Sequence, residues 1–264
     1  MVPETKIRRR LAQQAWQLLR SEKVVAGQRF AAEVLDELEE VGRVALIGGA
    51  LRELRYAPIK RFQSDLDFVV EVTKPEKFQS LVERRGATPN KFGGFRVSTP
   101  VVDIDFWDLR CSWAHTSGYK KVNDLEDVLN TTFFNVDAII YLLSDRKIYA
   151  KPGTLDDLER RYLDINLYPN PNPVGATVRA LRRMLELDMR ASELLVKYIA
   201  AQIDEVGWSK IVQIDRAAYP AKPSLGWVEG LFPKNGCDFL TLMKRTENKL
   251  PRMRQLQLCL SERP

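Results

Sequence analysis

A strand, a glycine pair, a helix and a second strand follow one another closely in this chain, and this order constrains the fold more than any other feature. Residues 43–47, RVALI, form a short apolar run that predicts a buried strand. Gly48 and Gly49 predict a tight turn that leads into a helix, which Pro58 ends. Residues 64–72, SDLDFVVEV, alternate polar and apolar side chains and predict the second strand. Strands that alternate with helices indicate an α/β (α+β) fold, a mixed sheet flanked by helices.

The mixed pattern continues up to a loop with three prolines, INLYPNPNP, and then changes. Amphipathic segments at 6–20 and 27–40 predict two N-terminal helices before the first strand. From Val174 onward the sequence predicts helices and loops and no strand. We therefore predict two domains, residues 1–168 with the sheet and the N-terminal helices, and residues 169–264 as a smaller all-helical domain.

Composition narrows the class of protein. Of the 264 residues, 45% are hydrophobic and 29% charged, which is typical of a globular domain, and no apolar run approaches the length of a membrane span. Cys111, Cys237 and Cys259 form neither a zinc pattern nor a disulfide framework, and the N-terminus does not resemble a signal peptide. We therefore expect a cytoplasmic protein without a membrane partner. The net charge of +6 weakly favours a polyanionic partner such as RNA or a triphosphate.

Asp65 and Asp67 are the first candidates for chemistry. Residues two apart in a strand point to the same face, and two neighbouring carboxylates repel each other unless a cation lies between them. Carboxylate oxygens suit Mg²⁺. An Asp-x-Asp pair by itself is common on a solvated strand, and a Gly-Gly pair by itself is usually only a turn. Here the turn at Gly48 and Gly49 leads into a helix N-terminus, where backbone N–H groups can hold a phosphate. A phosphate cradle followed by a metal pair indicates phosphoryl transfer.

A third carboxylate would complete such a site. The segment VVDIDFW offers Asp103 and Asp105 on one strand face, and from the alternation either can serve. The strand can also simply be exposed to solvent. The neighbouring Phe106 and Trp107 favour partial burial, where unpaired carboxylates are costly without a cation.

Together these motifs resemble the head domain of the CCA-adding enzymes and bacterial poly(A) polymerases, in the polymerase-β-like nucleotidyltransferase superfamily. IGGALRE and SDLDFVV carry the resemblance first, and further matches follow in the family's order over roughly residues 43–190. KFGGFRV resembles the family's Phe-Gly-Thr strand, and VVDIDFWDLR resembles its third-carboxylate strand. FFNVDAIIYLL resembles its Phe-Thr-Ile-Asn-Ala-Leu segment, and GTLDDLERRYLDI resembles its Gly-Gly-x-x-Asp-Leu segment. VRALRRMLEL resembles its neck helix.

The resemblance implies the residues' roles. Asp65, Asp67 and a third carboxylate would bind Mg²⁺ and form the catalytic set, and the position of Arg110 favours Asp105 over Asp103 as the third. An NTP would be the substrate, and its pyrophosphate would be released. The nucleotide-binding residues implied are Gly48, Gly49, Arg52, Asn135, Arg179 and Arg182. Arg179 and Arg182 can equally form a solvated basic face.

The chain departs from the family at two motifs. Leu129, Asn130 and Thr131 replace the Arg-Arg-Asp that holds the sugar, and residues 170–176 lack the carboxylate and arginine that select CTP and ATP. The region after the proline loop is also shorter than the family's body and tail. We therefore predict template-independent transfer to an RNA 3′ end, with tRNA as one candidate, by an enzyme that is not a true CCA-adding enzyme. The alternatives are a protein or small-molecule acceptor, or a catalytically degenerate RNA-binding relative.

Overall fold

Two structural units make up the chain in the computed structural model. The model describes residues 3–20, 28–90, 92–99, 102–220, 225 and 235–250. The first unit spans Met1–Leu158 and the second Glu159–Pro264. The sequence predicts the division after residue 168. That division stays a prediction. In the second unit, β8 (Tyr162–Leu163) pairs in parallel with β9 (Arg190–Ala191).

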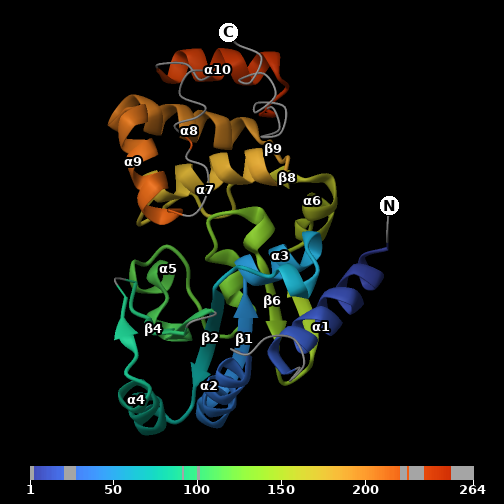
Figure 1. Cartoon of the computed structure of the whole chain (residues 1–264), viewed down its shortest axis with the longest axis vertical. Helices are drawn as coiled ribbons and strands as arrows, with labels where there is room; N and C mark the ends of the chain where they lie inside the picture. Colours follow the sequence, from blue (N-terminus) through green and yellow to red (C-terminus); the bar gives the residue numbers. More distant parts are fainter. Residues whose placement is uncertain are drawn as a thin grey trace. The chain divides into compact units, whose positions relative to one another are not determined.

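The first unit is built on one sheet of seven described strands (Figure 1). Its elements are α1 (Glu4–Arg20), α2 (Gln28–Val41), β1 (Gly42–Ile47), α3 (Gly49–Tyr56), η1 (Ile59–Arg61), β2 (Leu66–Val72), α4 (Pro75–Arg84), β3 (Thr88–Pro89), β4 (Phe95–Ser98), β5 (Asp103–Asp108), η2 (Leu109–Cys111), α5 (Trp113–Thr116), η3 (Asp127–Asn130), η4 (Asn135–Asp137), β6 (Ile139–Leu142), β7 (Lys147–Ala150) and α6 (Thr154–Arg160). The strand order is β3-β4-β5-β2-β1-β6-β7, with β2 and β5 parallel and the other neighbours antiparallel. The predicted α/β fold with a mixed sheet is confirmed.

The inner strand β1 is buried from Val44 to Ile47 because both faces of the sheet are covered there. Helix α2 packs against β1 and β2. The chain between residues 109 and 130 contributes to a second apolar layer, in which side chains of the sheet and of this segment form one core cluster. Its members are Ala45, Ile47, Val69, Leu109, Val122, Leu125, Val128, Leu129, Ile140 and Leu142. A continuous apolar run such as RVALI is what a strand covered on both faces requires.

Three phenylalanines pack the neighbouring strands β4 and β5 against helix α4. The ring of Phe106 lies 5.8 Å from that of Phe78 and 5.9 Å from that of Phe95, measured between centroids. Such edge-to-face and tilted arrangements are the favourable geometries for aromatic pairs. Because side chains alternate along a strand, this apolar anchoring leaves the opposite face of β4 and β5 available for polar side chains.

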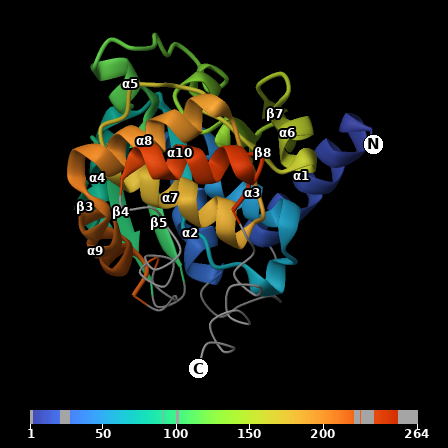
Figure 2. The same ribbon diagram turned by 90° about the horizontal axis from the view of Figure 1, so that it is seen from above.

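Helices dominate the second unit. Its described elements are β8, α7 (Pro173–Glu186), β9, α8 (Glu193–Val206), α9 (Trp208–Ala218) and α10 (Gly236–Arg245). Asn172 caps α7 by accepting a hydrogen bond from the Gly175 N–H at 3.1 Å, and Pro173 occupies the first helical position. Helix α10 lies along α8, as Figures 1 and 2 show. The sequence predicts no strand after Val174, whereas β9 forms a two-residue strand there.

The remaining expectations concern the membrane and the cysteines. In the part of the chain that the structure describes, no helix is both long and apolar enough to cross a bilayer. Cys111 and Cys237 are free thiols at exposed positions, and Cys259 lies outside the described residues.

Candidate active site

A row of charged side chains crosses three adjacent strands of the sheet. Arg96 on β4 pairs with Asp105 on β5, and Asp105 in turn pairs with Asp67 on β2. Residues directly opposite one another in neighbouring strands project from the same face. The next position along β2 and β5, Phe68 paired with Phe106, points to the other face. The row therefore places one guanidinium and two carboxylates on a common surface.

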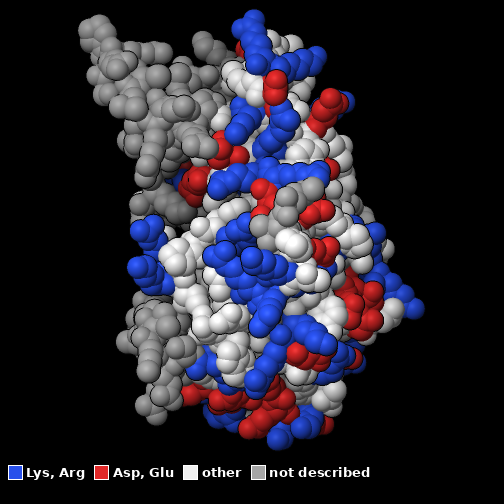
Figure 3. Space-filling model, turned by 90° about the vertical axis from the view of Figure 1, so that its right-hand side faces the viewer, with Lys and Arg blue, Asp and Glu red and all other residues white. Residues whose placement is uncertain are grey.

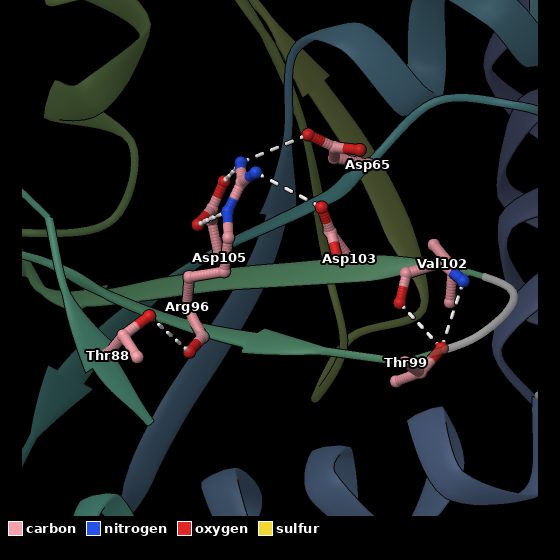
Figure 4. A network of polar contacts seen from close by, with 7 residues as sticks. All are labelled: Asp65, Thr88, Arg96, Thr99, Val102, Asp103 and Asp105. Carbon is pink, nitrogen blue, oxygen red and sulfur yellow. Dashed lines mark hydrogen bonds and ion pairs between the residues drawn. The ribbon is translucent and has the colours of Figure 1, made fainter. Parts of the chain in front are cut away.

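Arg96 binds three carboxylates with its guanidinium group. Its Nε donates to Oδ1 of Asp105 at 2.8 Å, and its Nη2 donates to Oδ2 of the same carboxylate at 2.5 Å. Its Nη1 donates to Oδ2 of Asp103 at 3.1 Å, and Nη2 also reaches Oδ2 of Asp65 at 3.1 Å. Figure 4 shows the three aspartates pointing toward this guanidinium. Asp103 and Asp105, both candidates for the third carboxylate, thus share one partner.

Asp67 has a different environment from its neighbours. No described residue forms a hydrogen bond or ion pair with its partly buried carboxylate. Burial raises the pKa of Asp67 to about 7, and the negative charges of Asp105, Asp65 and Asp137 add to this effect. Burial also raises the pKa of Asp65, with Arg96 acting in the opposite direction. The ionised form of Asp67 is therefore costly unless a cation approaches it.

Arg52 and Asp137 form the neighbouring ion pair. Arg52 lies on α3 and Asp137 ends η4, and Nη1 of Arg52 donates to Oδ1 of Asp137. Both side chains are largely buried. The sequence indicated Arg52 as a residue near the triphosphate, and in the structure its charge faces Asp137. Its contact with a nucleotide stays a prediction.

The glycine turn lies beside the start of β2. Gly48 has φ of 71°, in the left-handed region where a side chain is strained, so glycine is required there. A Cβ atom on Gly49 would lie 3.2 Å from Oγ of Ser64, the residue before Asp65. The N–H of Arg52 donates to the Gly48 carbonyl at 3.1 Å, which begins the hydrogen-bond ladder of α3. The amides before Arg52 thus have no partner within the helix, which is the arrangement that binds phosphate.

Asn135, another predicted nucleotide-binding residue, is held by a hydrogen bond. Its Nδ2 donates to Oδ2 of Asp157 on α6 at 2.8 Å, and the carbonyl of Asn135 accepts from Oγ1 of Thr154 at 3.2 Å. These contacts join the segment before β6 to the start of α6. Asn135 is partly exposed, and its contact with a nucleotide stays a prediction.

The two arginines predicted on the neck helix lie on α7 in the second unit. Arg182 is 4% exposed, and its guanidinium binds Asp215 at 2.6 Å and Glu186 at 2.7 Å. Arg179 is partly exposed. The pair with Asp215 joins α7 to α9, and a side chain this buried is not part of a solvated basic face. Nucleotide contact by Arg179 and Arg182 stays a prediction.

Sequence reasoning missed Arg96 and Asp137. Both lie in segments that carry the family resemblance, but neither was singled out. For Arg96 a signal was present, because a charged residue between Phe95 and Val97 must project from the polar face of a strand. For Asp137 no such periodicity exists, because it lies in the short helical turn η4.

The residues present fit a divalent cation by donor type and by charge. Five aspartates lie in or beside the row, against the two guanidinium groups of Arg52 and Arg96: Asp65, Asp67, Asp103, Asp105 and Asp137. Carboxylate oxygens are the ligands that Mg²⁺ prefers. Among the described residues no three metal-ligating side chains already surround a common point. The guanidinium of Arg96 lies among three of these carboxylates instead.

The fold has clear counterparts among solved structures. A structure described as a CCA-adding enzyme with CTP matches 91% of this chain with a TM-score of 0.55 at 17% identity. The CCA-adding enzyme of Thermotoga maritima, complexed with tRNA, matches 88% with a TM-score of 0.50 at 16% identity. A tRNA-processing enzyme in its apo form matches 87% with a TM-score of 0.51 at 20% identity.

The chain has the fold of the CCA-adding enzymes. The resemblance seen in the sequence is thereby confirmed at the level of the fold. The chain spans 59%, 55% and 53% of the lengths of the tRNA-processing enzyme, the CTP-bound enzyme and the tRNA-bound enzyme, respectively. No family model matches the sequence, and no curated protein is significantly similar to it.

Proposed function

We propose that this protein is a Mg²⁺-dependent nucleotidyltransferase that adds a nucleotide from an NTP to the 3′ end of an RNA without a template. The proposal rests on one observation: Asp67 on β2 and Asp105 on β5 stand directly opposite each other on parallel strands. The fold of the CCA-adding enzymes supports it. So does the glycine turn, in which Gly49 lies beside Ser64, just before the start of β2.

The chain's own residues would divide the work as follows. Asp65 and Asp67 would hold the Mg²⁺, and Asp105 would complete the site. The bound ion would neutralise charge on the phosphates and favour ionisation of the attacking hydroxyl. The free amides at the start of α3 bind the triphosphate, and Arg52 adds a positive charge beside them. The RNA 3′-hydroxyl would lose its proton to solvent and its oxygen would bond to the α-phosphorus. The bond from the α-phosphorus to the oxygen that bridges to the β-phosphate would break, and pyrophosphate would leave. Positioning and charge neutralisation provide most of the rate enhancement.

RNA is the acceptor class that the charge favours. The net charge is +6, and Figure 3 shows Lys and Arg side chains gathered in several places on the side where α1 lies in Figure 1, with Asp and Glu side chains among them. A positive surface attracts a polyanion at long range. One of the solved structures with this fold is complexed with tRNA, and tRNA is therefore one acceptor to test.

The nucleotide preference would differ from that of a CCA-adding enzyme. Residues 170–176, where the family reads the base edges, hold neither a carboxylate nor an arginine. In this structure Asn172 and Pro173 of that segment form the N-terminal cap and the first position of α7. A segment that caps a helix with an amide side chain offers no charged group for recognition of CTP and ATP.

Transfer assays with labelled nucleotides test the proposal. The protein is incubated with total RNA, Mg²⁺ and each α-³²P-labelled NTP in turn, and the labelled RNA 3′ ends are then sequenced. We expect incorporation from at least one NTP, and a loss of roughly 10³-fold in the Asp67→Asn variant, because the site loses a metal-binding charge. Asp145→Asn is the matched control, since Asp145 is an exposed aspartate after β6.

Each alternative has its own outcome. Label on a protein or small molecule, with none on RNA, would replace RNA by another acceptor. Tight RNA binding without pyrophosphate release, unchanged by Asp67→Asn, would identify a non-catalytic RNA-binding relative. An absence of incorporation from every NTP, with wild type and variant alike, would refute the proposed transfer.

A further inference from the structure

The guanidinium of Arg96 lies among Asp65, Asp103 and Asp105, in the carboxylate cluster that the proposed reaction uses. All three of its nitrogens donate hydrogen bonds, and both oxygens of Asp105 accept one (Figure 4). Asp103 and Asp65 each accept one more. A two-bond contact between arginine and a carboxylate is among the strongest and most directional polar contacts in proteins.

The bonds of Arg96 are distributed unevenly over the cluster. Asp105 receives two of them, whereas Asp67, its direct partner across β5 and β2, receives none from any described residue. Asp65 is bonded through Oδ2. The protein therefore compensates the charge of Asp105 with Arg96, whereas the charge of Asp67 has no such partner among the described residues. A cation arriving from solution meets its largest attraction beside Asp67.

Charge counting indicates how many divalent ions the site needs. When a bound cation favours the ionised form of Asp67, five ionised aspartates against the guanidinium groups of Arg52 and Arg96 leave three negative charges on the protein. One divalent ion would leave a single negative charge, whereas two would make the cluster positive before any nucleotide binds. Without Arg96 four negative charges would remain, and two divalent ions would balance them. The presence of Arg96 thus favours one ion over two.

The backbone holds Arg96 in this place. Arg96 lies in register with Asp105, and the apolar face behind it is fixed by the rings of Phe95, Phe106 and Phe78. The tight turn before β4 depends on Gly93, where φ is 84° and a Cβ atom would lie 2.9 Å from the carbonyl oxygen of Cys111. The position of Arg96 therefore follows from the strand pairing and does not depend on its side-chain contacts alone.

We propose that Arg96 is a built-in cation of this active site, which takes the place of a second divalent ion beside Asp105. The protein then binds one divalent ion, at Asp65 and Asp67. This inference rests on the proposed function. It concerns the binding of the ion, however, and ion binding is measured without any nucleotide.

Titration with Mn²⁺ followed by electron paramagnetic resonance tests the inference, because the signal of free Mn²⁺ reports how many ions the protein takes up. We expect one tightly bound ion per wild-type chain and two in Arg96→Gln. Arg96→Lys keeps the charge and is expected to bind one. Arg43→Gln is the matched control, because Arg43 on β1 forms an exposed ion pair with Glu71 on β2 at 3.0 Å, and it should bind one ion as well.

A second variant tests the same inference from the carboxylate side, whatever the stability of Arg96→Gln. If Arg96 rather than the ion holds Asp105, then Asp105→Asn should leave one bound Mn²⁺, with an affinity within about threefold of wild type. A loss of about tenfold or more would show that Asp105 binds the ion directly and would overturn the inference. Asp67→Asn provides the contrast, because it should lower the affinity by at least that factor.

The remaining outcomes separate the inference from the proposed function. Two ions in the wild type, no ion in any protein, or an ion count unchanged in a folded Arg96→Gln variant would each overturn the inference. One ion in the wild type and two in Arg96→Gln, combined with no nucleotide transfer, would refute the function and leave the role of Arg96 standing.

Discussion

Two arginines in this protein each bind several acidic side chains, but their surroundings differ. Arg182 in the second unit is 4% exposed, and it binds Asp215 and Glu186 while its Cζ lies 4.3 Å from the centre of the Tyr219 ring. Arg96 in the first unit has a side chain that is 39% exposed and binds three aspartates.

The difference lies in how completely the charges are satisfied. Asp215 is fully buried, and besides Arg182 it accepts a hydrogen bond from the backbone of Leu225 at 2.7 Å. Beside Arg96, in contrast, Asp67 has no partner among the described residues, and burial together with the neighbouring charges raises its pKa to about 7. A saturated and buried cluster stabilises a fold, whereas an incompletely compensated cluster at an accessible position is typical of a functional site.

The largest effect that this comparison predicts is on stability in the second unit. Asp215→Ala removes one partner of a buried ion pair and leaves both Arg182 and the Leu225 N–H without that acceptor. We expect the free energy of unfolding to fall by about 3–5 kcal/mol, measured by urea denaturation followed by circular dichroism. A loss below about 1 kcal/mol would show that the Arg182 cluster is not structural and would break the comparison.

A smaller effect of opposite sign is expected at Asp67. Asp67→Asn removes a charge that repels Asp65, Asp105 and Asp137, so the metal-free variant should be more stable than wild type by about 1 kcal/mol, or roughly 2–4 °C in Tm. Excess Mg²⁺ should raise the Tm of wild type and leave that of the variant almost unchanged. A variant that is less stable than metal-free wild type would place Asp67 with Asp215, as a structural residue.

The smallest effect is expected at an exposed ion pair of the second unit. Arg190 and Glu247 also form an ion pair in the second unit, but the side chain of Glu247 is 80% exposed. Solvent screens such a pair, so Glu247→Ala should change the free energy of unfolding by no more than about 0.5 kcal/mol in the same urea experiment. A loss comparable to that of Asp215→Ala would show that burial is not what distinguishes the clusters.

Alternation in the sequence predicted the faces of the strands but not their alignment. It placed Asp103 and Asp105 on one face, and both side chains do reach Arg96. Which of them stands opposite Asp67 depends on the register of β2 against β5, and the structure pairs Asp67 with Asp105. Register depends on packing and on turn geometry across distant segments, and a period of two carries no information about it.

The same limit applies to Arg182 and to the proline loop. Helical spacing could not distinguish a solvated Arg182 from a nucleotide-binding one, because its partner Asp215 lies on a different helix. The proline loop indicated where the pattern changes, but β8 before the loop pairs with β9 after it. Both are long-range contacts, which no local pattern encodes.

The parallel pairing of β2 with β5 has a consequence for when this site comes into existence. Parallel strands cannot be joined by a tight turn, and here α4 and the β3–β4 hairpin fill the crossover between them. A nascent chain that has been synthesised only as far as α4 already contains Asp65 and Asp67 but lacks the strand that carries Asp105 and the one that carries Arg96. The row of Arg96, Asp105 and Asp67 therefore cannot form until β5 has left the ribosome.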